Sequence, residues 1–311
     1  MSQTVRIAGI DVGKEQLVIA CPALGIGMGV ANDRDGHEAI VAWLGEHQIA
    51  VAAVEASGGY ERAVMARLGA VGLVVRHLNP LRVRRFAEAR GRLAKNDRAD
   101  AETIARYAET FVDEHTAPPP DAQRDALREH LLVRTNTLHA ITLATNQLEH
   151  LRDKSLRAIL AARRTSLQLT LKRLDARIAA LVIATPNLAA AAARLRSVPG
   201  VGPVLAHTLI ALLPELGRLT RRQVASLAGV APFDDDSGKH RGLRHIAAGR
   251  AAVRQVLYMA ALVAKRCNPA IRTFAERLKG KPPKTIIAAC MRKLLVILNA
   301  IARDAAVWKP A

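Results

Sequence analysis

The sequence predicts an α/β domain over residues 1–117, followed by helical segments that continue to residue 311. Three observations lead to this prediction. Short apolar runs alternate with helix-like patterns in the first part of the chain. The proline-rich stretch Thr116-Ala-Pro-Pro-Pro120 then interrupts the alternation. Residues 121–181 contain neither glycine nor proline, and their apolar residues recur at helical spacing.

The α/β domain begins with three strand-like runs that are close enough in sequence to pair as hairpins. Helices and strands then alternate, and a basic helix starting at Asn79-Pro80 is followed by a helix at 97–109. The expected strands are 5–12, 16–21, 26–31, 49–54 and 73–78, with helices at 36–47 and 60–68. The order βββ-α-β-α-β-α predicts a mixed sheet of the RNase H-like type and not a Rossmann sheet.

Residues 121–187 are expected to form two long helices. The second helix has apolar residues at alternating steps of four and three, the spacing of a coiled-coil seam: Leu167, Leu171, Leu174, Ile178 and Leu181. These helices could fold back as a hairpin or pair between subunits, and the pattern fits both. Residues 188–311 are a third, helical segment, with turns expected at 199–203, 232–242 and 280–283.

The charge balance indicates a polyanionic partner. Lys and Arg number 46 and Asp and Glu 27, which gives a formal net charge of +19. Nucleic acid is the first expectation for such a chain, and an anionic membrane surface is the alternative. Because half of the residues are hydrophobic, a disordered tail is excluded.

The chain shows no secretory signal, and its longest apolar stretches are broken by polar residues. Cys21, Cys267 and Cys290 are scattered and lack the spacing of a metal site or a disulfide framework. We therefore expect a soluble cytoplasmic protein with reduced cysteines.

Four acidic residues stand where a metal site could form. Asp11 ends the first strand, Glu55 follows the strand at 49–54, and Asp97 and Asp100 share one face of a helix. If they meet at the carboxyl edge of the sheet, they could hold one or two Mg²⁺ ions for phosphoryl transfer. Taken singly, each acid could instead cap a turn or a helix or pair with a neighbouring base. Gly9-Ile-Asp-Val-Gly13 also resembles the first phosphate loop of actin-like ATPases, but the second loop of those proteins is missing.

Other residues are candidates for contacts with nucleic acid. Leu195–Leu213 fits a helix–hairpin–helix, in which Gly200 and Gly202 allow a tight turn and the next helix offers free N–H groups to a phosphate. An ordinary turn between packed helices is the alternative. The remaining candidates are basic residues, which could equally be solvated: Arg82, Arg84, Arg85, Arg90 and Arg92 on or beside the basic helix, and Lys239, Arg241 and Arg244 in a polar loop after Ser237.

Six motifs in register resemble the DEDD transposases of the insertion-sequence family one-ten, which are bridge-RNA-guided recombinases. They are Gly9-Ile-Asp-Val-Gly-Lys14, Val54-Glu-Ala-Ser-Gly-Gly-Tyr60, Lys95-Asn-Asp-Arg-Ala-Asp-Ala101, Val198-Pro-Gly-Val-Gly-Pro203, Leu227-Ala-Gly-Val-Ala-Pro232 and Ser237-Gly238. The resemblance implies a RuvC-like domain at 1–117, a coiled coil at 121–187 and a transposase domain at 188–311. Two departures are Asn96, where Thr is more usual, and the acidic run Asp234–Asp236 before Ser237.

The same resemblance implies roles for individual residues. Asp11, Glu55, Asp97 and Asp100 would bind Mg²⁺, and Ser237 would be the nucleophile. It also implies a structured bridge RNA that pairs with donor and target DNA, and a homo-oligomer in which the acids of one subunit face the serine of another. A host that is a bacterium or an archaeon is implied as well.

We therefore expect a DNA transposase in which Ser237 attacks a phosphodiester and keeps the bond energy in a phosphoserine. Two other functions stay open at this point. A non-catalytic nucleic-acid-binding scaffold needs only the charge, the coiled coil and the hairpin motif. A RuvC-type endonuclease needs the acids but leaves Ser237 idle.

Overall fold

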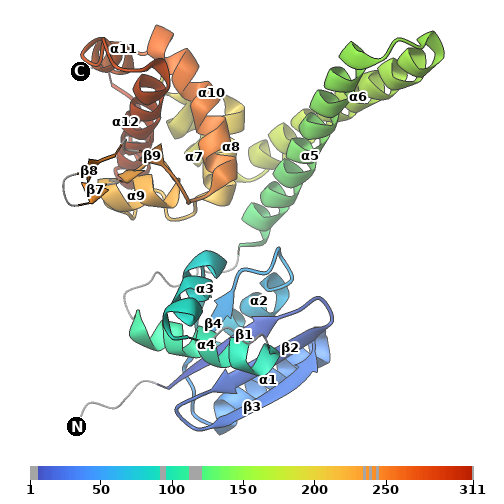
Figure 1. The fold of residues 1–311 in the computed structure, drawn as a ribbon, viewed down its shortest axis with the longest axis vertical. Helices are drawn as coiled ribbons and strands as arrows, with labels where there is room; N and C mark the ends of the chain where they lie inside the picture. Colours follow the sequence, from blue (N-terminus) through green and yellow to red (C-terminus); the bar gives the residue numbers. More distant parts are fainter. Residues whose placement is uncertain are drawn as a thin grey trace. The chain divides into compact units, whose positions relative to one another are not determined.

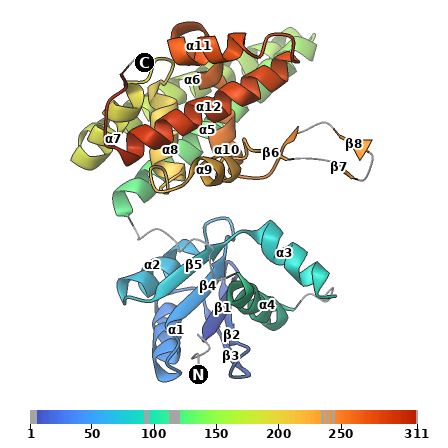
Figure 2. The ribbon, with the colours of Figure 1, turned by 90° about the vertical axis from the view of Figure 1, so that its left-hand side faces the viewer.

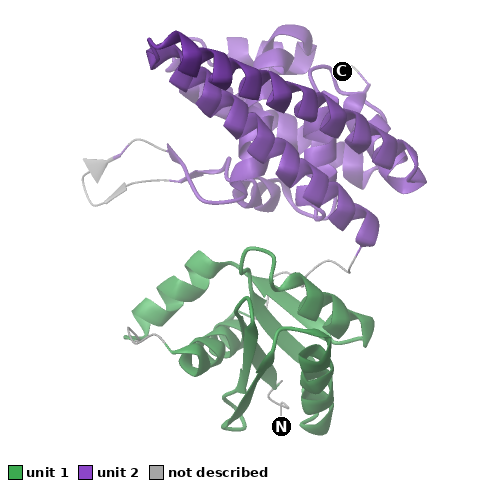
Figure 3. Ribbon diagram, turned by 90° about the vertical axis from the view of Figure 1, so that its right-hand side faces the viewer, with its two compact units in different colours: residues 1–120 green, residues 121–311 purple. Residues whose placement is uncertain are grey.

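The structure is a computed structural model of the 311-residue chain. It describes residues 6–91, 96–111, 121–233, 236–237, 240–242 and 245–309. The chain divides into two compact units, Met1–Pro120 and Asp121–Ala311 (Figure 3). The division falls at the proline-rich stretch, whereas the expected border between residues 187 and 188 lies inside the second unit.

Unit 1 contains a five-stranded mixed sheet with the order β3-β2-β1-β4-β5 (Figure 1). Its strands are β1 (Ile7–Val12), β2 (Gln16–Cys21), β3 (Ile26–Ala31), β4 (Val51–Glu55) and β5 (Val74–Leu78). β2 pairs antiparallel with β1 and β3, while β1, β4 and β5 run parallel. The predicted α/β class, the mixed sheet and the order of strands and helices along the chain are confirmed.

Burial explains which strands are central. All the apolar residues of β4 are buried, as expected of a parallel strand that is covered on both faces. The edge strand β3 instead alternates half-buried and exposed residues. One face of the sheet packs against α1 (Arg34–Glu46) and α2 (Arg62–Ala70). The other packs against α3 (Pro80–Ala89) and α4 (Asp97–Thr110), as Figure 2 shows.

Unit 2 is built mainly from helices. α5 (Ala122–His150) and α6 (Lys154–Ile183) lie side by side as a hairpin, and Arg134 and Asp175 form an ion pair of 2.6 Å between them. Of the expected seam, Ile178 is buried and the four leucines are half-buried. The base of the hairpin shares a core with the helices that follow, which joins it to the rest of the unit. Those helices are α7 (Pro186–Arg196), α8 (Pro203–Leu212), α9 (Arg221–Leu227), α10 (Ala251–Cys267), α11 (Pro269–Glu276) and α12 (Pro283–Arg303).

α12 is long and apolar enough to cross a membrane by length and composition. One side of the helix, however, supplies the centre of the unit 2 core, including the fully buried Leu294, Leu295 and Leu298. This burial is typical of the core helix of a globular domain.

The polar loop expected at 232–242 contains short strands. β6 (Pro232–Phe233) pairs with β9 (His245–Ile246), and β7 (Asp236–Ser237) pairs with β8 (His240–Arg241). Two residues separate β7 from β8, which is the length of a tight hairpin connection. We call residues 230–248 the serine arm.

Candidate active site

Asp11 and Glu55 lie next to each other at the carboxyl ends of β1 and β4. The two strands are parallel, and their register pairs Gly9 with Ala53 and Ile10 with Val54. The next position in this register is occupied by Asp11 and Glu55. Side chains alternate along a strand, so both acids share the face of Ile7, Val51 and Ala53, which is the face that α3 and α4 cover. Both are half-buried.

The first turn of α4 lies toward the same end of β1. Gly9 packs so closely on α4 that a Cβ at this position would overlap the carbonyl oxygen of Ala101. Ile7, at the start of β1, belongs to the same buried cluster as Ile104, Tyr107 and Ala108 in the later turns of α4. α4 therefore runs antiparallel to β1, and its N-terminal acids Asp97 and Asp100 extend toward the Asp11 end.

Asn96, and not Asp97, is the N-cap of α4. Its Oδ1 accepts hydrogen bonds from the backbone N–H groups of Arg98 at 2.9 Å and Ala99 at 3.2 Å. This removes helix capping as an explanation for Asp97, which is exposed at the first helical position. It also explains why Asn can stand where Thr is more usual, because both residues cap helices.

Carboxylates at one sheet edge are the donor set that Mg²⁺ prefers. Within the described ranges, however, no three His, Cys, Asp or Glu side chains are close enough to form a metal site. Asp11, Glu55 and Asp100 each already make another polar interaction. The four acids have the residue types and the placement that Mg²⁺ needs. In this structure, however, their side chains are not close enough together to surround an ion.

Glu61 is an acid that the sequence did not single out. The residue is 5% exposed, and its side chain accepts hydrogen bonds from Ser57 N, Ser57 Oγ and Gly59 N at 3.1, 3.0 and 2.8 Å. Nε2 of His77 on β5 lies 3.6 Å away. Burial alone would raise the pKa of Glu61, but the interactions with His77 and the loop N–H groups outweigh it and lower the pKa well below its ordinary value. Glu61 thus fixes the loop that follows Glu55.

The residues that flank the serine arm, Gly229 and Gly249, are tightly packed against each other. Both glycines have positive φ, +70° and +66°. Their backbones are in contact, and neither position has room for a Cβ. Beside them, Arg250 donates two hydrogen bonds of 2.6 Å to the carboxylate of Glu215. Ser237 stands opposite His240 in the β7–β8 ladder. The side chains of Ser237 and Arg241 lie outside the described part of the chain, as do Lys239 and Arg244 entirely.

The basic helix α3 presents its arginines to solvent: Arg82, Arg84, Arg85 and Arg90 are all exposed. Arg84 pairs with Glu88 at 3.2 Å, and Arg90 lies 5.5 Å from the ring centre of Phe86. Arg85 makes no ion pair with any residue that the structure describes. Arg92 falls outside the described residues.

The two glycines of the expected helix–hairpin–helix differ. Gly200 has φ +93°, and a Cβ there would lie 2.6 Å from Cα of Ala264 on α10. Gly202 is exposed, has φ −86° at the N-cap of α8, and has open space around it. Packing therefore accounts for Gly200 but not for Gly202.

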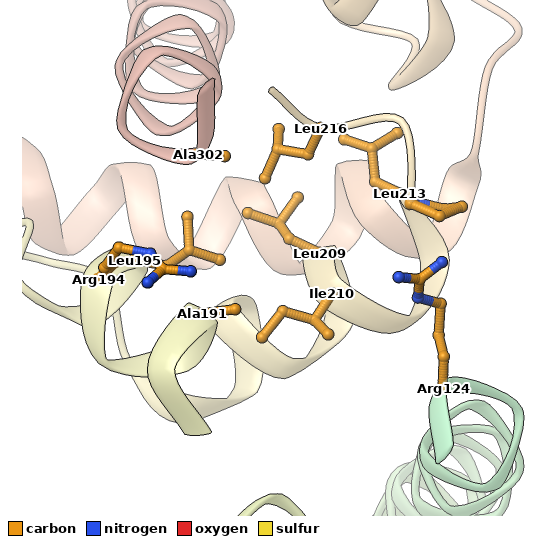
Figure 4. A pocket seen from close by; sticks show the side chains of 10 residues that line it. Arg124, Ala191, Arg194, Leu195, Leu209, Ile210, Leu213, Leu216 and Ala302 are labelled. Carbon is orange, nitrogen blue, oxygen red and sulfur yellow. The ribbon is translucent and has the colours of Figure 1, made fainter. Parts of the chain in front are cut away.

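A cavity of about 180 Å³ lies in unit 2, whereas the four acids belong to unit 1 (Figure 4). Its walls are mainly aliphatic side chains of α7 and α8, and Leu216 and Ala302 complete the lining. Arg124 and Arg194 bring guanidinium groups to its margin. It contains no carboxylate, so it is not the acidic site.

Two family models match most of this chain. One, for the DEDD transposases of IS110, matches residues 8–155, and the other, described as the transposase IS116/IS110/IS902 family, matches residues 192–276. The chain belongs to the IS110 family of transposases. The first match contains all four acids, and the second contains both hairpin glycines and Ser237.

Similar proteins agree with this membership. The transposase is 28% identical to the pilin gene-inverting proteins of Moraxella bovis and Moraxella lacunata over 88% of its length and 87% of theirs. It is 34% identical to an uncharacterized 42 kDa protein of insertion element IS900 from Mycobacterium paratuberculosis, over 37% of this chain and 30% of that one. The chain is therefore an enzyme of DNA transposition or recombination, and the scaffold function is not supported.

Proposed function

We propose that this transposase cuts and rejoins DNA strands with Ser237 as nucleophile and with Asp11, Glu55, Asp97 and Asp100 as ligands of Mg²⁺. The observation that supports it most is the placement of Asp11 and Glu55 side by side at one sheet edge, with the α4 acids extending toward that edge. Mg²⁺, when bound, supplies Lewis-acid activation of a hydroxyl and neutralises charge on a leaving oxygen.

The residues of the chain then have distinct tasks. The Oγ of Ser237 forms a bond to the phosphorus of a DNA phosphodiester while the bond from phosphorus to the 3′-oxygen breaks. The serine proton ends on the 3′-hydroxyl. The phosphoserine keeps the bond energy, and attack by the 3′-hydroxyl of another strand restores Ser237 and completes strand exchange without ATP.

The two sets of catalytic residues belong to different units, the acids to unit 1 and Ser237 to unit 2. We propose that they meet in a homo-oligomer, a dimer or a tetramer, in which one subunit supplies the acids and another the serine. In this assignment unit 1 is a RuvC-like RNase H domain, α5 and α6 are the coiled coil, and residues 188–311 are the transposase domain.

A structured bridge RNA is the proposed source of sequence recognition, since it would pair with donor and target DNA. The exposed arginines of α3 support an interaction with phosphates of RNA or DNA. Gly202, the exposed N-cap residue of α8, is a candidate for a further backbone contact to phosphate. The proposed place of action is the cytoplasm, on nucleoid DNA.

The decisive experiment compares Ser237→Ala and Asp11→Asn in a strand-exchange assay with end-labelled DNA. Ser237→Ala should form no covalent protein–DNA adduct and still bind RNA, and Asp11→Asn should not cleave at all. Ser226→Ala and Asp35→Asn replace exposed residues outside the proposed site and should behave as wild type. Cleavage by Ser237→Ala without an adduct would favour the RuvC-type endonuclease.

A further inference from the structure

Asn32 joins the two loops that follow Asp11 and Glu55. It lies directly after β3, at the entrance to α1. Its Nδ2 donates one hydrogen bond to the carbonyl oxygen of Gly13 at 2.9 Å and another to that of Tyr60 at 3.3 Å. Gly13 is two residues beyond Asp11, and Tyr60 belongs to the loop that begins after Glu55.

The position and the orientation of the amide are themselves fixed. The backbone N–H of Asn32 donates to the carbonyl of Glu15 at 2.9 Å, which holds the residue against the β1–β2 turn. Nε2 of His37, a residue only 8% exposed, faces Oδ1 of Asn32 at 2.8 Å. With Oδ1 occupied by the imidazole, Nδ2 is the atom that faces the two carbonyl oxygens.

This connection acts beyond the last direct pairing of β1 with β4. The ladder between β1 and β4 pairs residues up to Ile10 and Val54, one position before the two acids. Asp11 is still paired with Val18 on β2, and Glu55 with Leu78 on β5. The segments that follow the two acids, the β1–β2 turn and the loop 56–61, have no strand ladder between them. The loop contains Gly58 and Gly59 at φ +75° and +113°, a backbone that needs outside contacts to keep one conformation. Glu61 fixes the loop from within, through Ser57 and Gly59, and Asn32 ties it to the β1–β2 turn.

We propose that Asn32 is a positioning residue of the acidic site, which keeps the carboxylates of Asp11 and Glu55 at the spacing that a divalent cation needs. The inference rests on the proposed function, because it assigns Asn32 a role in the same site. A ligand pair held by outer-shell hydrogen bonds loses less freedom when it binds a metal, and removing such bonds costs about 10–100-fold in metal affinity.

Two variants of the full-length protein test this role. Asn32→Asp keeps the size of the side chain and the acceptor for His37, but it replaces the donor by an oxygen that repels the carbonyls of Gly13 and Tyr60. Asn32→Ala removes both hydrogen bonds without introducing charge. Asn146→Asp is the matched control, because Asn146 is exposed on α5 and its side chain makes no hydrogen bond with a described residue.

Three measurements separate positioning from stability. Hydrogen exchange without metal should become faster in residues 13–15 and 56–60 of both variants. The midpoint of a Tb³⁺ luminescence titration without DNA should rise by about tenfold or more. DNA strand cleavage should fall, and the Mg²⁺ concentration for half-maximal cleavage should rise in parallel. Thermal unfolding and DNA affinity should stay close to wild type, which a merely structural role would not predict.

The controls distinguish this inference from the proposed function. If Asp11→Asn shifts the Tb³⁺ midpoint but both Asn32 variants do not, the positioning role is wrong and the metal site stands. If Asp11→Asn leaves the midpoint unchanged, the metal site itself is wrong, and the role of Asn32 is overturned with it. Should Asn32→Asp unfold, Asn32→Ala supplies the same comparison.

Discussion

At the scale of single residues, Glu61 shows how a buried charge can be stabilised by a short loop. Its pKa is lowered from an ordinary value of 4.5, since the contacts with His77 and with the N–H groups of the loop outweigh burial. A group whose pKa is lower in the folded state stabilises the fold above its unfolded pKa. We therefore expect the contribution of Glu61 to be complete above about pH 5 and to be lost as the pH falls below 4.5.

Glu61→Gln should lower the free energy of unfolding at pH 7 by roughly 1–3 kcal/mol, the range for hydrogen bonds to a charged group. The difference from wild type should shrink at pH 3, because the wild-type carboxylate then loses its advantage. Urea unfolding at both pH values measures this. Glu46→Gln, at an exposed position on α1, should change little. An equal effect of Glu61→Gln at both pH values would contradict the assignment.

The two hairpin glycines give a second prediction at this scale. Gly200→Ala must adopt φ +93° and place a Cβ against Ala264, so we expect a loss of roughly 2–4 kcal/mol in the free energy of unfolding. Gly202→Ala meets no neighbour and should change stability by less than about 1 kcal/mol. Chemical denaturation of both variants checks the contrast. Similar losses in both would mean that packing does not separate their roles.

At the scale of elements, the sequence predicted the sheet well and the serine arm poorly. Continuous apolar runs such as 49–54 identified buried parallel strands, and the structure places β4 at Val51–Glu55. The sequence predicts a polar loop at 232–242, whereas the described residues of the arm contain four strands. Each strand is only two residues long, and most of their residues are polar. Strands of that length have no hydrophobic period that a sequence pattern could reveal.

The contact between α4 and β1 was equally hidden in the sequence. Gly9 belongs to a motif that predicts a phosphate loop or a metal ligand, yet its own role is to let α4 approach β1. The hydrogen bonds of Asn32 and Glu61 were missed for a similar reason. Asn32 joins segments that are distant in sequence, Glu61 binds N–H groups within its own loop, and neither arrangement leaves a periodic signal. The placement of Asp11 beside Glu55, by contrast, follows from two parallel strand ends.

Gly9→Ala tests the contact at this scale. The added Cβ would overlap the backbone of Ala101, so α4 must shift away from β1 or the domain must lose stability, by roughly 1–3 kcal/mol or more. A shift of α4 would also carry Asp97 and Asp100 away from Asp11, and we expect DNA cleavage to fall while DNA binding persists. Gly45→Ala is the control, because Gly45 is exposed on α1 with open space around it. Full cleavage activity in Gly9→Ala would contradict the proposed arrangement of the acids.

At the scale of the whole molecule, charge was the most informative property of the sequence. A net charge of +19 indicated nucleic acid as the partner, and the matches to DNA transposases agree with it. The sequence could not show how the proposed serine and the proposed acids would meet, because its local patterns describe each unit separately. Composition also gives no information on which of the many basic residues touch phosphate. The structure reduces the number of candidates, because a basic residue that is exposed and not ion-paired is the more available for a phosphate contact.

Arg85 and Arg67 form a matched pair for this question. Arg85 is exposed on α3 without an ion pair to any described residue, whereas Arg67 donates two hydrogen bonds of 2.6 and 2.7 Å to Glu38. A phosphate contact releases counterions, so Arg85→Gln should reduce the slope of log affinity for duplex DNA against log salt by about 0.9. Arg67→Gln should leave the slope unchanged, since its charge is already paired. Fluorescence anisotropy over a series of KCl concentrations measures both, and equal slopes for Arg85→Gln and wild type would mean that this arginine of α3 is solvated and contacts no DNA phosphate.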